Sequence, residues 1–76
     1  MKTRIQVTFA DGVSSKYAYA LVERYNGIVE STVSDFPGCR DIAFLAMESS
    51  DTQIWKKAFE VDPKVSEILL IPPRST

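Results

Sequence analysis

Residues 4–29, RIQVTFADGVSSKYAYALVERYNGIV, carry the pattern that decides the fold: a strand, a helix and the start of another strand. Ile5, Val7 and Phe9 alternate with polar residues, and this period of two is typical of a half-buried strand. Apolar residues then recur at i, i+3, i+4 and i+7, namely Ala18, Leu21, Val22 and Tyr25. This spacing predicts an amphipathic helix with one apolar stripe.

Local signals mark both ends of this helix. Ser14 and Ser15 precede the stripe, and serine is a favoured N-cap because its hydroxyl accepts a hydrogen bond from a free backbone N–H. Asn26 and Gly27 follow the stripe, and these residue types adopt the left-handed backbone that ends many helices. We therefore expect the helix to begin after the serines and to stop at Asn26-Gly27.

The rest of the chain predicts three more strands and a second helix. Residues 28–34 are rich in β-branched side chains, and residues 40–47 are apolar at both alternating sets of positions. Between them, residues 35–38, DFPG, are typical of a turn, so these two strands should form a hairpin. The second helix has an apolar stripe of Ile54, Trp55, Ala58 and Phe59. Residues 66–71 form the last strand, which ends at two prolines because proline cannot donate to a strand ladder.

The order of these elements, β-α-β-β-α-β, predicts an α+β fold of the ferredoxin-like class. With right-handed crossovers, the strands form a four-stranded antiparallel sheet with both helices on one face. The chain has 76 residues, enough for one such domain at residues 1–76 and not for two. The second face of the sheet is then open, and we expect the last few residues to form a loose tail.

Alternation assigns side chains to the open face. In the first strand, Ile5, Val7 and Phe9 should point to the helices. The opposite set of this strand consists of Arg4, Gln6 and Thr8. In the third strand, the outward set is either Ala43, Leu45 and Met47 or Ile42, Phe44 and Ala46. Either set is apolar, which indicates a contact surface unless loops or the tail cover it.

Composition excludes several classes of function. The chain has no histidine and one cysteine, so no Cys/His zinc site, internal disulfide or catalytic triad can be assembled. We therefore expect no metal, no cofactor and no enzymatic activity. No apolar run is long enough to span a membrane, and a lone thiol without a targeting signal fits the nucleus or the cytoplasm. The net charge of -1 lacks the basic excess of an electrostatic nucleic-acid binder.

Two segments carry the motifs of a known family. Residues 40–47, RDIAFLAM, follow an eight-residue motif of the third strand, with matches at Arg40, Ala43, Phe44 and Leu45. In that motif Asp41 replaces the usual glycine, and Ile42 replaces an aromatic residue. Residues 5–10 occupy the place of a six-residue motif on the first strand, where Gln6 replaces the usual aromatic residue. Over nearly its whole length, the chain resembles a degenerate RNA recognition motif domain.

The resemblance implies a binding site on the open face. It places Gln6, Ile42 and Phe44 there, at positions where the family stacks the bases of single-stranded RNA. Phe44 is the one aromatic residue among these three, so the resemblance implies that RNA is bound weakly. Two arginines flank the face, where they would contact phosphates. The candidate nucleic-acid-binding residues are Arg4, Gln6, Thr8, Arg40, Ile42 and Phe44.

Two other functions stay open. The missing aromatics, the near-neutral charge and the apolar third strand favour a protein-interaction module on the same scaffold. Trp55 would be its contact residue if exposed on the second helix, although its spacing from Phe59 suits the core. Residues 11–13 and 27–31 also resemble an ACT domain, which implies a dimeric regulatory domain that binds small molecules, but Asp11 replaces that family's usual proline. A monomer is favoured over a dimer.

Overall fold

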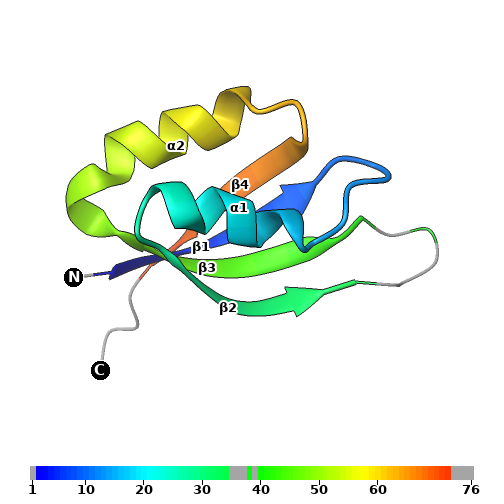
Figure 1. Ribbon diagram of the computed structural model, residues 1–76, viewed down its shortest axis with the longest axis horizontal. Coiled ribbons are helices and arrows are strands. Elements are labelled where there is room, and N and C mark those ends of the chain that lie inside the picture. Colours follow the sequence, from blue (N-terminus) through cyan, green and yellow to red (C-terminus); the bar gives the residue numbers. More distant parts are fainter. Residues whose placement is uncertain (1, 35–37, 39, 73–76) are drawn as a thin grey trace.

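The computed structural model describes residues 2–34, 38 and 40–72, and these ranges form the strands and helices that Figure 1 shows. The elements are β1 (Lys2–Phe9), α1 (Tyr17–Arg24), β2 (Ile28–Val33), β3 (Ile42–Glu48), the 3-10 turn η1 (Ser49–Asp51), α2 (Thr52–Val61) and β4 (Val65–Ile71). The four strands form one antiparallel sheet in the order β2-β3-β1-β4. The prediction of an α+β fold with a four-stranded antiparallel sheet and two helices is confirmed.

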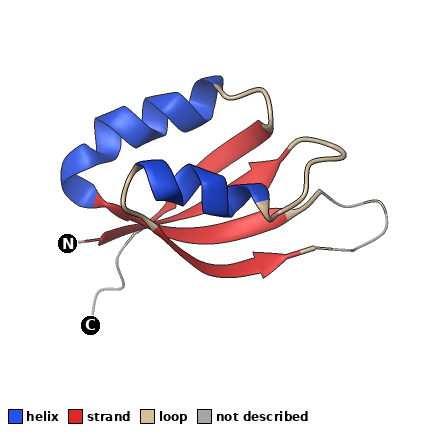
Figure 2. Cartoon of the chain, in the orientation of Figure 1, coloured by secondary structure: helices blue, strands red, loops and turns tan. Residues whose placement is uncertain are grey.

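Both helices lie on the same face of the sheet, with α1 over β2 and β3 and α2 beside β4 (Figure 2). The core between the two layers is built from alternate residues of β1 and β3 and from the apolar stripes of both helices. Its buried members are Ile5, Val7, Phe9, Ala18, Leu21, Val22, Ala43, Leu45, Met47, Trp55, Phe59 and Val65. In β3, Ala43, Leu45 and Met47 therefore face the helices, and the alternation in β1 is confirmed.

Trp55 lies in the core and not on the surface. Its side chain has no exposed area, and its indole N–H donates a hydrogen bond of 2.9 Å to the carbonyl oxygen of Glu48. The ring also packs against Phe59, with 5.9 Å between the ring centroids. The core position is thus confirmed, and a protein contact through Trp55 is wrong because the buried indole cannot reach a partner.

One member of the predicted stripe of α2 points away from the core. Ile54 is 61% exposed, although it directly precedes the buried Trp55. Successive residues of an α-helix are rotated by about 100°, so the face that buries Trp55 and Phe59 turns Ile54 outward. Apolar character alone does not distinguish these two neighbours.

The ends of α1 differ from the prediction. The N-cap residue is Lys16, which makes no side-chain cap hydrogen bond, and the Ser14 hydroxyl accepts from the Lys16 N–H over 3.2 Å in the turn before the helix. The Ser15 N–H instead donates to the Asp41 carboxylate over 2.9 Å, which ties the start of α1 to the segment before β3. At the other end, Asn26 takes the left-handed conformation with a φ of 54°.

Gly27 lies in close packing with Met47 and Val22. A side chain there would overlap the sulfur of Met47, and its Cβ would lie 3.1 Å from the Cβ of Val22. The Gly27 N–H also donates to the Val22 carbonyl over 2.9 Å, which helps to close the end of α1. The residue therefore lets α1 and β2 approach the buried β3.

Parts of two predicted features lie outside the described residues. These are residues 35–37 of the predicted turn and residues 73–76 of the predicted tail. Gly38, which is described, has a φ of 80°, in the region that favours glycine. Because β2 and β3 pair in antiparallel register, the predicted hairpin is confirmed.

Candidate functional site

The face of the sheet opposite the helices is the open face. Directly opposed residues of antiparallel strands point to the same side, so the strand register defines the residues of this face. Three rows cross it in the order β2-β3-β1-β4, namely Ser31-Phe44-Gln6-Leu69, Val33-Ile42-Thr8-Glu67 and Ile28-Ala46-Arg4-Ile71. The row named first lies between the other two, and it places Phe44 directly opposite Gln6 on the two central strands.

Apolar side chains on the open face extend over strands at both edges of the sheet. Ile28 on β2 is 56% exposed and Leu69 on β4 is 55% exposed. Ile42 and Phe44 on β3 and Ile71 on β4 are half-buried. The polar side chains of β1 separate the apolar residues of β2 and β3 from those of β4. The larger apolar group is therefore the one on β2 and β3, and an exposed apolar group of this kind is a candidate contact site.

The register brings together most of the residues predicted for the site. Arg4, Gln6, Thr8, Ile42 and Phe44 all lie on the open face. Arg40 lies outside the strands, just before β3, and its guanidinium reaches the start of β4.

Four apolar residues of this face were missed by sequence reasoning, and they are Ile28, Val33, Leu69 and Ile71. Residues 68–71 are apolar at every position, so alternation gives no signal for which side faces out. On β2, the register shifts between Val29 and Ser31. That irregularity breaks the simple alternation from which Ile28 and Val33 could have been assigned to this face.

The arginines of the candidate site are held by carboxylates. The Arg4 Nε donates to Glu30 Oε1 over 2.8 Å. The Arg40 Nε donates to Asp11 Oδ1 over 3.3 Å, and its Nη1 donates to the Ser66 hydroxyl over 3.0 Å.

Such exposed pairs contribute about 0–1 kcal/mol each, so a ligand can displace them. An incoming phosphate would nevertheless compete with a carboxylate at Arg4 and at Arg40. Glu67, in the same row as Ile42 and Thr8, adds a further negative charge on the face. The electrostatics of the open face therefore disfavour a polyanion and suit a neutral, apolar ligand.

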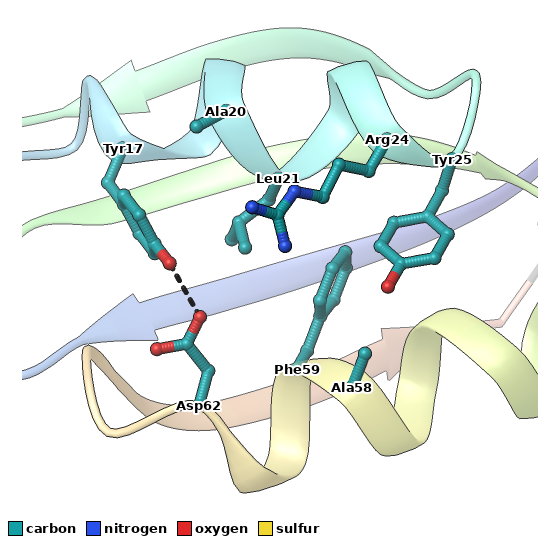
Figure 3. Close-up of a pocket in the computed structure, with 8 residues that line it drawn as sticks. All are labelled: Tyr17, Ala20, Leu21, Arg24, Tyr25, Ala58, Phe59 and Asp62. Atoms are coloured by element: carbon teal, nitrogen blue, oxygen red, sulfur yellow. Dashed lines mark hydrogen bonds between the residues drawn. The ribbon is translucent and has the colours of Figure 1, made fainter.

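A hollow lies on the helix side of the sheet, between α1 and α2 (Figure 3). Its volume is about 100 Å³, and it is lined by Tyr17, Ala20, Leu21, Arg24, Tyr25, Ala58, Phe59 and Asp62. The Tyr17 hydroxyl donates to Asp62 Oδ2 over 2.7 Å, which links α1 to the end of α2. That bond, together with partial burial, raises the pKa of Tyr17 above its usual value near 10.

The Tyr17–Asp62 bond predicts a dependence of stability on alkaline pH. The bond needs the protonated phenol, and the pKa of Tyr17 is higher in the folded than in the unfolded state. Its contribution is thus complete below the unfolded pKa near 10 and is lost as the pH rises through the raised pKa. Tyr17→Phe should cost about 1 kcal/mol at pH 7 in urea unfolding, and this difference should vanish at strongly alkaline pH.

A matched change at an exposed tyrosine of the same helix is the control. Tyr19 is 59% exposed, so Tyr19→Phe should leave the unfolding midpoint unchanged at both pH values. An equal loss at neutral and alkaline pH for Tyr17→Phe would show that the loss does not come from the hydrogen bond of the protonated phenol.

No protein-family model matches the chain, and no curated protein matches it. Among the described residues, no group of His, Cys, Asp and Glu side chains is placed to hold a metal ion. In the same ranges, no helix is long and apolar enough to cross a membrane. The functional assignment therefore rests on the surface chemistry of the open face.

Proposed function

We propose that this chain is a non-enzymatic protein-interaction module of the ferredoxin-like class that binds an apolar segment of a partner on its open face. The class is supported by the element order β-α-β-β-α-β together with the strand order β2-β3-β1-β4. The observation that carries the function is the apolar group on β2 and β3 of the open face, made of Ile28, Val33, Ile42 and Phe44.

The charges bordering this surface support a neutral partner. Arg4 and Arg40 are each paired with a carboxylate, so neither presents an unopposed positive charge. An apolar partner segment leaves these pairs intact and removes water from the central side chains. Aromatic anchors at the centre of an interface often contribute 2 kcal/mol or more, so Phe44→Ala should weaken binding by roughly thirtyfold.

Photo-crosslinking of the full chain in a cell lysate tests this function. A photoreactive amino acid at Ile28, which is 56% exposed on the open face, should give a discrete adduct of higher mass that nuclease treatment leaves unchanged. The same amino acid at Ile54, which is 61% exposed on α2, is the matched control and should give no such adduct. Phe44→Ala should abolish the adduct at position 28.

Other outcomes of this experiment would contradict a protein partner. A nuclease-sensitive adduct at position 28 would show that the face binds nucleic acid. Adducts of equal yield at positions 28 and 54, or none at either, would show that the open face is no specific protein-binding surface.

Single-stranded RNA is the second candidate, and one observation favours it. Phe44 is half-exposed at the centre of the sheet with the Gln6 amide opposite, an arrangement that could stack one base and hydrogen-bond its edge. One stacked base contributes about 1–3 kcal/mol, which would give weak binding. Titration with mixed single-stranded RNA should then shift amide signals of β3 in a salt-sensitive way that Phe44→Ala removes. The ACT-like small-molecule function stays a prediction.

A further inference from the structure

Strand β4 forms one edge of the sheet. It pairs with β1 on one side, and within the described ranges no other backbone segment pairs with its outer side. Alternate N–H and C=O groups of an edge strand point outward, where they can bind another strand. Residues 68–71 are also all apolar, with Leu69 55% exposed on the open face and Leu70 38% exposed on the helix side.

Proteins usually protect such an edge with lysine, proline, a bulge or a covering element. The opposite edge, β2, has polar residues in its middle, and its register shifts between Val29 and Ser31. β4 also has a register shift, which leaves Ser66 unpaired near the start of the strand, but from Glu67 to Ile71 its pairing with β1 is regular and Glu67 is its one charged residue. This regular stretch of β4 is therefore the better template for adding a strand.

We propose that β4 pairs in antiparallel register with β4 of a second copy of this chain, about a two-fold axis at Leu69. This register places Leu69 of the two copies together on the open face and Ile68 opposite the partner subunit's Leu70 on the helix side. Glu67 then lies opposite the partner subunit's Ile71, so the two carboxylates stay apart. A two-fold axis at Glu67 would bring the like charges together, which is unfavourable.

The surface beside β4 has room for the side chains that this pairing brings in. A hollow of about 280 Å³ is lined by Glu60, Val65, Ser66, Glu67 and Ile68, between α2 and the first half of the strand. Because Ile68 is opposed by the partner subunit's Leu70, that leucine would lie at this hollow. The same contact repeats on the other copy by symmetry, as in an isologous interface.

The dimer would join two four-stranded sheets into one sheet of eight strands. Its two open faces would then lie side by side and form one wider surface. This outcome differs from the monomer that the sequence favours, because the apolar character of residues 68–71 indicates a strand without showing that it lies at an edge.

Measurement of mass in solution by sedimentation over a range of concentrations tests the proposal with the full chain. The mass should rise with concentration from 8.5 kDa to twice that value. Leu70→Lys should keep the chain monomeric, because it places a charge at the pairing edge. Val33→Lys, at a residue of similar exposure (36%) on the opposite edge strand, should leave the dimer intact.

These two variants separate the edge dimer from other assemblies. A monomeric wild type at all concentrations, or a dimer that Val33→Lys disrupts and Leu70→Lys does not, would overturn the proposal. Circular dichroism checks that both variants are folded. If Leu70→Lys is unfolded, amide hydrogen exchange of the wild type decides: protection of residues 66–71 should increase with concentration, and a constant protection would refute the edge pairing.

The test is independent of the proposed function. Leu70 is on the helix side of β4, so Leu70→Lys leaves the side chains of the open face unchanged. A monomeric Leu70→Lys variant that still crosslinks through position 28 would support both proposals. Failure of the dimer with retained crosslinking would reject the edge pairing alone.

Discussion

Trp55→Ala is expected to lower the free energy of unfolding by about 3–5 kcal/mol, as large-to-small changes of buried aromatic residues do. The indole has no exposed area, and its removal leaves a cavity between α2 and the sheet. It also leaves the carbonyl of Glu48 without the donor that it has at 2.9 Å. A domain of this size has a total stability of about 4–11 kcal/mol, so much of it would be lost.

Thermal unfolding followed by circular dichroism measures this loss. A change of 1 kcal/mol shifts the midpoint by about 4–8 °C in domains of this size, so the variant should melt at least about 12 °C below the wild type. Trp55→Phe is the matched control, since it keeps an aromatic ring and removes the N–H, and it should cost less. A midpoint for Trp55→Ala within about 4 °C of the wild type would contradict the core position.

Gly27→Val is expected to cost about 1–3 kcal/mol or more by overpacking. The new Cβ would overlap the Met47 sulfur and lie 3.1 Å from the Val22 Cβ, and the two methyl groups of valine would crowd the site further. Met47 is fully buried in β3, so its side chain has little room to move aside. Urea unfolding at neutral pH measures the loss.

Removal of the obstructing side chain is the control for this prediction. Met47→Ala is itself destabilising because it opens a cavity, but it creates room for the valine. The double variant should therefore lose less stability than the sum of the two single losses. Strictly additive losses would show that the contact with Met47 is not the source of the effect.

The core was predictable wherever alternation or helical spacing carries a single meaning. Ile5, Val7 and Phe9 stand between polar residues, so their burial follows from the sequence alone. Ile54 and Trp55 are neighbours in one apolar stripe, and the choice between them depends on how α2 lies over the sheet. The predicted cap at Ser15 also depended on tertiary structure, because the Ser15 N–H donates to Asp41, a residue that is distant in sequence.

The candidate site was predictable in its centre and not in its surroundings. Phe44 and Gln6 lie on the open face as expected, because both positions follow from alternation and from the family resemblance. The pairing of Arg4 with Glu30 joins β1 to β2, two strands that do not touch in the sheet order. A contact of this kind depends on the register of three strands, which sequence patterns do not specify.

The central place of β1 has a consequence for how the chain folds. β1 pairs with β4, and the partners Arg4 and Ile71 are separated by most of the sequence. Closing so large a loop costs entropy before the contact contributes, and non-local pairing of this kind slows folding. A nascent chain that has synthesised β3 but not β4 would thus expose one side of β1. We therefore expect β4 to dock late in folding. Until it docks, the exposed side of β1 can pair with a strand of another chain.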